Sequence, residues 1–327
     1  MRAAVCPSYG PPEVVRVETI PAPLLGDGQV RVSVDAAAVN YPDVLLVAGE
    51  YQVAVPPPFV PGSEFAGRVT EVGAGVEGFA VGDRVSGSGM FGAFAEEAVV
   101  GAMALRTIPT FVDSRIAAAF GVAHRTAYHV LRSVARVKPG DELIVLGAGG
   151  GVGLAAVQLG SVLGASVTAV ASSPSKLAVA TSLGATHTID HRETDLRGAL
   201  RDLLPNGADV VIDPVGGDLS EPALRSLRWG GRFVTVGYAS GTIPRIPLNL
   251  VLLKGVVILG FQFIDFVAHS AEDFRQGEAE LDELLEAGRA VPHVGTVLGL
   301  DDVAAGLRLV ADGQAIGKVV IDVGRAG

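Results

Sequence analysis

The stretch Gly147–Gly160 constrains the fold more than any other part of the sequence. It reads GAGGGVGLAAVQLG, with five glycines within seven residues, and it follows the apolar run ELIVL (142–146). A strand, a glycine turn and a helix in this order form the dinucleotide-binding turn of βαβ folds. The glycines let the backbone approach a diphosphate, whose charge is favoured by the N–H groups at the start of the helix. The alternative is a glycine-rich turn without a ligand.

The residues around this turn predict a parallel sheet. From about Asp113 onward, strand-like runs alternate with amphipathic runs that predict helices at 152–163, 175–183, 195–203 and 219–227. Further helices are expected at 271–287 and 300–311. Such alternation builds right-handed βαβ units and a parallel sheet that is covered on both faces.

The first part of the chain has a different pattern. Residues 30–100 contain short β-type runs broken by Gly and Pro, which is typical of an antiparallel, barrel-like domain. The last apolar run, GKVVIDV (317–323), is expected to return to that domain. The predicted fold class is therefore α/β, with a β-barrel domain of residues 1–122 and 266–327 and a doubly wound cofactor domain of residues 123–265.

Charge and composition exclude several classes of function. The net charge of −10 opposes non-specific nucleic-acid binding, although a local basic patch is possible, and a single Cys with six scattered His gives no zinc-site spacing. No apolar run approaches the roughly 20 residues that span a bilayer. The N-terminus has no signal-peptide pattern, so we expect a soluble, cytoplasmic protein without membrane or nucleic-acid partners.

The position that distinguishes NAD from NADP lacks a carboxylate. NAD sites place Asp or Glu about 20 residues after the glycines, where it binds the ribose 2′-OH. Here the strand SVTAVA (166–171) is followed by SSPSK (172–176). Small hydroxyls and a Lys suit a 2′-phosphate, so we predict NADP(H) as the cofactor. The alternative is that Lys176 only covers a solvated helix face.

Four separated segments resemble the medium-chain dehydrogenase/reductase superfamily. They are VNYPD (39–43), PGSEFAGRVTEVGAGVEGFAVGDRV (61–85), GAGGGVGLAAVQLGSVLGASV (147–167) and LGATHTID (183–190). Within the superfamily they look like the zinc-independent quinone oxidoreductase branch, which includes zeta-crystallin. The resemblance extends over essentially the whole chain. It implies a GroES-like β-barrel catalytic domain, a Rossmann cofactor domain and a homodimer.

The departures from the zinc-dependent members have a chemical consequence. Where those enzymes place Cys, His and Cys as zinc ligands, this chain has Asn40, Ser63 and about Val122. No metal site is therefore expected, and no Lewis acid would polarise an alcoholate. We predict hydride transfer from NADPH to a quinone, with one- or two-electron reduction left open. The alternative on the same scaffold is reduction of a 2-enal, an enone or an enoyl thioester.

The resemblance also implies contacts with the cofactor. They are Asn40 and Thr126 at the nicotinamide; Gly150, Gly151 and Val152 at the pyrophosphate; Ser172 and Lys176 at the 2′-phosphate; His191 near the adenosine phosphate; Gly237, Tyr238 and Ser240 beneath the nicotinamide; Phe261 and Phe263 beside the cleft; and Lys318 close to the cofactor. For His191 the alternative is an exposed loop His, and for Lys318 it is a solvated Lys.

Three side chains are candidate catalytic residues on the substrate side. Tyr41 or Tyr51 could hydrogen-bond a carbonyl oxygen, and His124 could donate a proton. The alternatives are packing for the two Tyr and a hydrogen-bonded helical His for His124. Enoyl reduction needs such a donor, whereas a quinone can take its protons from water. A third hypothesis is a structural or RNA-binding role, as known for zeta-crystallin-like proteins, which the acidic charge disfavours.

Overall fold

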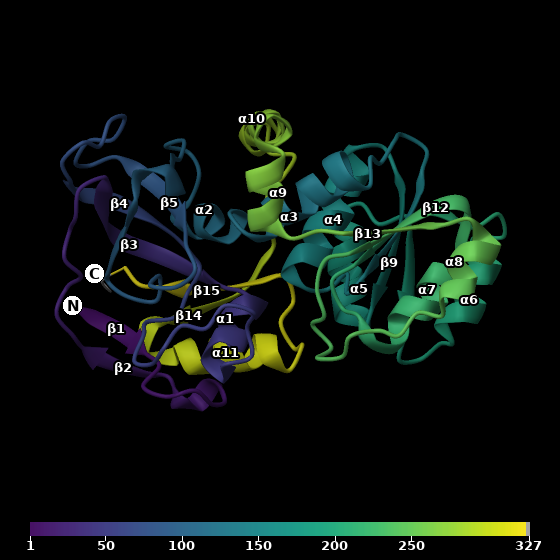
Figure 1. Ribbon diagram of the computed structural model, residues 1–327, viewed down its shortest axis with the longest axis horizontal. Helices are drawn as coiled ribbons and strands as arrows, with labels where there is room; N and C mark the ends of the chain where they lie inside the picture. Colours follow the sequence, from purple (N-terminus) through teal and green to yellow (C-terminus); the bar gives the residue numbers. More distant parts are fainter. Residues whose placement is uncertain (325–327) are drawn as a thin grey trace. The chain divides into compact units, whose positions relative to one another are not determined.

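The computed structural model describes residues 1–324, which divide into two compact units (Figure 1). Unit 1 comprises Met1–Val122 and the segment that begins at Pro292, and unit 2 comprises Ala123–Val291. The chain therefore leaves unit 1, builds all of unit 2, and returns.

Unit 1 is built mainly from strands. They are β1 (Arg2–Val5), β2 (Arg16–Thr19), β3 (Gln29–Val39), β4 (Glu64–Val72), β5 (Arg84–Ser88), β6 (Glu97–Gly101), β7 (Leu105–Thr107), β14 (Val294–Gly299) and β15 (Lys318–Asp322). The helices are α1 (Tyr41–Ala48), α2 (Ser114–Phe120) and α11 (Val303–Ala311), with short turns η1 (Pro12–Val14), η2 (Ala102–Ala104) and η5 (Leu300–Asp302).

The main sheet of unit 1 has the strand order β14–β15–β3–β4–β5–β7, and β6 pairs with β3. The long strand β3 alternates buried and half-buried residues over its first half, because one face of the sheet covers the core. As expected, the last strand returns to this unit, where β15 pairs antiparallel with β3 and parallel with β14. Its residues Val319, Val320 and Ile321 are at most 1% exposed, so it is an interior strand.

Unit 2 alternates strands and helices. The strands are β8 (Glu142–Leu146), β9 (Ser166–Ala171), β10 (His187–Asp190), β11 (Ala208–Asp213), β12 (Leu227–Thr235) and β13 (Val257–Gly260). The helices are α3 (Ala123–His129), η3 (Val130–Val134), α4 (Gly151–Val162), α5 (Pro174–Ser182), α6 (Leu196–Leu203), η4 (Gly217–Leu219), α7 (Ser220–Arg225), α8 (Leu248–Lys254), α9 (Phe263–His269) and α10 (Ala271–Glu286).

The six strands of unit 2 form one parallel sheet with the order β10–β9–β8–β11–β12–β13. Helices α6, α7 and α8 lie on the opposite side of this sheet from α4 and α5 (Figure 1). Both faces are thus covered, and strands β8 and β11 are almost completely buried, with apolar residues at the centre of each, as is typical of parallel strands. The predicted α/β class with a doubly wound sheet is confirmed.

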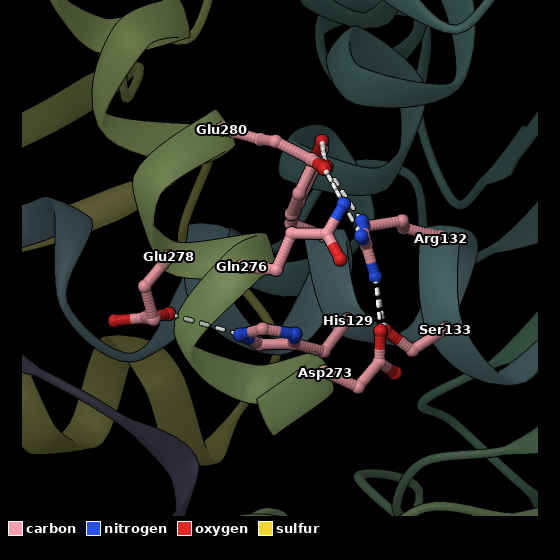
Figure 2. A network of polar contacts seen from close by, with 8 residues as sticks. His129, Arg132, Ser133, Asp273, Gln276, Glu278 and Glu280 are labelled. Carbon is pink, nitrogen blue, oxygen red and sulfur yellow. Dashed lines mark hydrogen bonds and ion pairs between the residues drawn. The ribbon is translucent and has the colours of Figure 1, made fainter. Parts of the chain in front are cut away.

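Residues 266–291 belong to unit 2, whereas the sequence prediction placed them in the first domain. The physical reason is a set of polar contacts between α10 and the α3–η3 segment (Figure 2). The Nε2 atom of His129 lies 2.9 Å from Oε1 of Glu278. Nε of Arg132 donates a hydrogen bond to Oε2 of Glu280 over 2.5 Å, and Arg132 also forms an ion pair with Asp273.

Aromatic rings complete this attachment. The buried His129 ring is surrounded by Phe263, Phe266 and Phe274, with ring centroids 5.1 to 6.2 Å away. The guanidinium of Arg125 lies 5.1 Å from the centroid of Phe263, at cation–π distance. Helices α9 and α10 therefore complete unit 2.

Candidate functional site

The glycine turn joins β8 to α4 at the carboxyl end of the strand. A Cβ atom at position 153 would lie 2.0 Å from the carbonyl oxygen of Gly147, so Gly153 is required for the close packing of the helix on its own turn. A Cβ atom at position 150 would meet only that same oxygen, at an ordinary 3.7 Å. Packing explains Gly153 but not Gly150. A bare backbone at Gly150, directly before α4, suits the approach of a diphosphate.

Several predicted cofactor residues lie at one edge of the unit 2 sheet. In a parallel sheet the carboxyl ends of neighbouring strands meet at the same edge. Ser172 follows β9, His191 follows β10, Gly237 lies two residues beyond β12, and Phe261 follows β13. The structure therefore brings these positions to the edge that carries the glycine turn.

The ends of β9 and β10 bring Ser172, Lys176 and His191 together. Nζ of Lys176 donates to Oγ of Ser172 over 3.1 Å. Burial and the nearby charge of Arg192 lower the pKa of Lys176. Burial is also the main reason that the pKa of His191 is lowered, and the half-buried ring differs from the exposed loop His that was the alternative.

The loops that follow β11 and β12 pack against each other. Asp213 accepts hydrogen bonds from the N–H groups of Val215 and Gly216, at 2.8 Å each, so it holds the start of the loop after β11. The ring of Tyr238 packs directly on Gly216, where a Cβ atom would lie 2.9 Å from it. Oγ of Ser240 accepts a hydrogen bond from the backbone N–H of Thr242, so the predicted Tyr238 and Ser240 lie in an ordered loop.

A buried polar cluster in unit 1 contains two more predicted residues. Nζ of Lys318 lies 2.6 Å from Oδ1 of Asn40 and 2.7 Å from Oε1 of Glu64. Nδ2 of Asn40 donates to the same Glu64 oxygen over 2.9 Å and to Oγ of Ser63 over 3.1 Å. The side chains of Lys318 and Glu64 are 4% and 1% exposed, so Lys318 is a buried ion-pair partner rather than a solvated Lys.

Asp43 belongs to the same cluster. Its Oδ2 accepts the backbone N–H of Asn40 over 2.8 Å at the start of α1. Complete burial raises the pKa of Asp43 to about 7, against the opposite effect of that hydrogen bond and of the Ser63 hydroxyl. The Lys318 charge also lowers this pKa, and the Glu64 charge raises it. Sequence reasoning missed Asp43 and Glu64, although both lie in segments that carry the resemblance.

The three candidate catalytic residues lie in different surroundings. Tyr41 is the first residue of α1, and Tyr51 packs against the apolar core of unit 1. Burial raises the pKa of both phenols, so both hydroxyls stay protonated at neutral pH. His124 is 3% exposed in α3, with Nε2 3.0 Å from Oε1 of Gln158. The same oxygen accepts the backbone N–H of Val291, which fits the hydrogen-bonded helical His of the alternative.

The remaining predicted residues are Thr126, Gly151, Val152, Phe261 and Phe263. Thr126 is half-buried in α3, and Gly151 and Val152 form the first turn of α4. Phe261 and Phe263 stack edge to face with centroids 6.2 Å apart. In the described part of the chain, residues 1–324, no group of three or more His, Cys, Asp or Glu side chains is arranged to hold a metal ion. Within the same residues, no helix is long and apolar enough to cross a membrane.

Comparison with known proteins agrees with this architecture. Residues 26–110 match the alcohol dehydrogenase GroES-like domain, and residues 151–283 match the zinc-binding dehydrogenase family. A quinone oxidoreductase-like protein 2 homolog of Nematostella vectensis is 36% identical over 325 residues, which cover 98% of this chain and 88% of that protein.

Two solved structures are similar over almost the whole chain. A mycobacterial protein complexed with NADPH has a TM-score of 0.91 and 30% identity, with 99% of this chain and 100% of that chain covered. Escherichia coli quinone oxidoreductase complexed with NADPH also has a TM-score of 0.91, with 26% identity and the same coverage. The chain therefore belongs to the medium-chain dehydrogenase/reductase superfamily, in its zinc-independent quinone oxidoreductase branch.

Proposed function

We propose that this protein is an NADPH-dependent oxidoreductase that transfers a hydride to a quinone without a zinc ion. Bound NADPH would supply the hydride, and the protein would supply binding, orientation and electrostatics. The family of the chain supports an oxidoreductase, and two structural neighbours are NADPH complexes.

The end of β9 carries the proposed use of NADPH. The residues after this strand are Ser172 to Lys176, without a carboxylate that would bind a ribose 2′-OH and repel a 2′-phosphate. The hydroxyl of Ser172 and the ammonium of Lys176 are already within hydrogen-bond distance of each other, so both can reach one phosphate. The open backbone at Gly150 fits the pyrophosphate of the same cofactor.

The buried cluster of unit 1 supports chemistry without zinc. Asn40 and Ser63 stand at positions where zinc-dependent relatives carry ligands, and neither offers a thiolate or an imidazole. The nearby Glu64 is engaged by the Lys318 ammonium. Lys318 and Glu64 hold the Asn40 amide in one orientation, because its oxygen accepts from Lys318 and its nitrogen donates to Glu64. The Asn40 amide is therefore fixed in orientation, which suits the nicotinamide contact that the resemblance implies.

The alternative acceptors are 2-enals, enones and enoyl thioesters. These substrates need a proton as well as a hydride, and the protonated Tyr51 hydroxyl could supply a hydrogen bond to a carbonyl oxygen. His124 is a weaker candidate, because its Nε2 is already bonded to Gln158. A quinone needs neither side chain.

We also propose that the protein forms a homodimer through β13. We propose in addition that it is cytoplasmic. Within the described residues β13 pairs only with β12, so its other edge offers unpaired N–H and C=O groups. Val257 and Ile258 are 47% and 39% exposed on this strand. The preceding helix α8 exposes Leu248, Leu252 and Leu253. An apolar edge strand of this kind suits pairing with a second copy, and light scattering that shows only a monomer would exclude it.

The test is a titration with NADPH and with NADH, followed by nicotinamide fluorescence. The cofactor that binds is then presented with 9,10-phenanthrenequinone and, in separate assays, with 2-alkenals. The variants are Lys176→Met for cofactor choice and the double variant Tyr51→Phe/His124→Gln for proton donation.

We expect tighter binding of NADPH than of NADH, loss of this preference in Lys176→Met, and rapid quinone turnover that survives in the double variant. Turnover of alkenals alone, abolished in the double variant, would move the assignment to enone reduction. Absence of binding by both cofactors would refute the proposed enzyme.

A further inference from the structure

A second cation lies beside the proposed 2′-phosphate position. Strands β9 and β10 run parallel with Asp190 opposite Ala171, and the N–H of His191 donates to the Ala171 carbonyl over 3.1 Å. The next N–H, that of Arg192, donates to Oδ1 of Asp190 over 3.0 Å. These two bonds fix the start of the loop after β10, so that Arg192 leaves the sheet close to the residues that follow β9.

The electrostatics of the three basic side chains agree with this placement. Burial is the main cause that lowers the pKa of Lys176, and the charge of Arg192 lowers it further. Arg192 and Lys176 both lower the pKa of His191, whereas the Asp190 charge raises it. Arg192 has an exposed side chain, and within residues 1–324 it forms no ion pair with a carboxylate. An anion bound near the ends of β9 and β10 would be attracted by both positive charges.

The stem of Lys176 lies directly across the glycine turn. A Cβ atom at position 149 would lie 2.4, 2.5 and 2.7 Å from Cδ, Cγ and Cβ of Lys176. The contact involves the base of the side chain, which α5 holds in place, so a side chain at 149 would force the whole stem aside. The absence of a side chain at Gly149 therefore leaves room for the Lys176 side chain. At Gly150, by contrast, no contact within the protein explains the absence of a side chain.

We propose that Arg192 is the second cation of the 2′-phosphate site and that Gly149 is a positioning residue, which keeps Lys176 directed toward that phosphate. This inference rests on the proposed use of NADPH. A 2′-phosphate carries close to two negative charges at neutral pH. The Arg192 fork and the Lys176 ammonium together match that charge and its several acceptor oxygens. The 2′-hydroxyl of NADH offers no charge to either group.

The test compares Arg192→Gln and Gly149→Ala with the wild-type protein. The control is Arg201→Gln, which removes the same charge from an exposed side chain of α6 in the same unit. Dissociation constants are measured by fluorescence for NADPH and NADH, and by competition for 2′,5′-ADP and 5′-AMP. Urea unfolding of each variant checks that unit 2 is intact.

We expect Arg192→Gln to weaken NADPH and 2′,5′-ADP about tenfold, the effect of losing one charge-assisted hydrogen bond, and to leave NADH and 5′-AMP unchanged. Gly149→Ala should show the same selectivity, and Arg201→Gln should bind all four ligands like the wild type. If the wild type prefers NADPH and Arg192→Gln keeps that preference, the inference is wrong while the proposed function stands. If Gly149→Ala weakens all four ligands equally, Gly149 does not act through Lys176. A wild type without any preference for NADPH would refute the proposed cofactor itself.

Discussion

Replacement of Lys318 by Met tests the buried cluster of unit 1. The Lys318 ammonium neutralises Glu64, and the two side chains are 4% and 1% exposed. In Lys318→Met, Glu64 keeps hydrogen bonds from Nδ2 of Asn40 and, over 2.7 Å, from the N–H of Val122, but its charge is no longer paired. Removal of one partner from a buried ion pair costs about 3 to 5 kcal/mol. We expect unit 1 to lose this amount of unfolding free energy at pH 8.

The assay must separate the two units. Amide hydrogen exchange of the buried strands β8 and β11 in urea follows the unfolding of unit 2. Amide hydrogen exchange of β3 and β15 in urea follows unit 1. The matched control is Arg2→Gln, which breaks an ion pair with Asp301 whose side chains are 47% and 71% exposed, and which should cost less than about 1 kcal/mol.

One further measurement makes the reasoning refutable. The double variant Lys318→Met/Glu64→Gln should recover most of the lost stability, since it leaves no buried charge at this position. A loss below about 1 kcal/mol at pH 8, or a double variant as unstable as the single one, would show that the ion pair is not the source of stability.

Three other predictions concern single positions. The pKa of Asp43 is about 7 in the folded protein and roughly 3.9 in an unfolded chain, so the contribution of Asp43 to stability falls as the pH rises from about 4 to about 7. The variant Asp43→Asn should therefore gain stability relative to the wild type between pH 5 and 8, measured by urea titration. Stability curves of the two proteins that run parallel over this pH range would contradict the prediction. Gly153→Ala places a Cβ atom against the Gly147 carbonyl and should destabilise unit 2 by about 1 to 3 kcal/mol. Gly150→Ala should keep the stability of the wild type and lose NADPH binding in a fluorescence titration. The reverse pattern would show that Gly150 serves packing and Gly153 serves the cofactor. Ile258→Glu should convert the proposed dimer to a monomer in light scattering, and an unchanged mass would exclude β13 as the interface.

Several helix positions in unit 2 could be predicted from local signals, whereas α8 and α9 were not predicted. Asp195 accepts the N–H of Gly198 at the start of α6, and Ser173 accepts the N–H of Lys176 at the start of α5, so the predicted starts are right to within one residue. The glycine turn and the order of strands and helices carry equally local information, which is why the parallel sheet was predictable.

Partners that are distant in the sequence could not be predicted. The amphipathic pattern of 271–287 predicts a helix with one apolar face but does not say which unit covers it. Glu278 and His129 are 149 positions apart, and Lys318 and Glu64 are 254 positions apart. A lone Lys in an apolar run and an acid after a Pro-rich loop have no local feature that pairs them. The role proposed for Arg192 also had no local signal in the sequence, although this residue directly follows the predicted His191.

The hydrogen bonds of Gln158 also show how unit 2 fits as an insertion within the chain of unit 1. One oxygen, Oε1, contacts His124 at the beginning of unit 2 and the N–H of Val291 at its end. A domain is tolerated as an insertion within another domain when its two ends lie close together, because widely separated ends would distort the surrounding domain. A single glutamine on the first helix after the glycine turn joins these ends. The two ends of unit 2 are thus held close together, which is the arrangement that insertion into another chain requires.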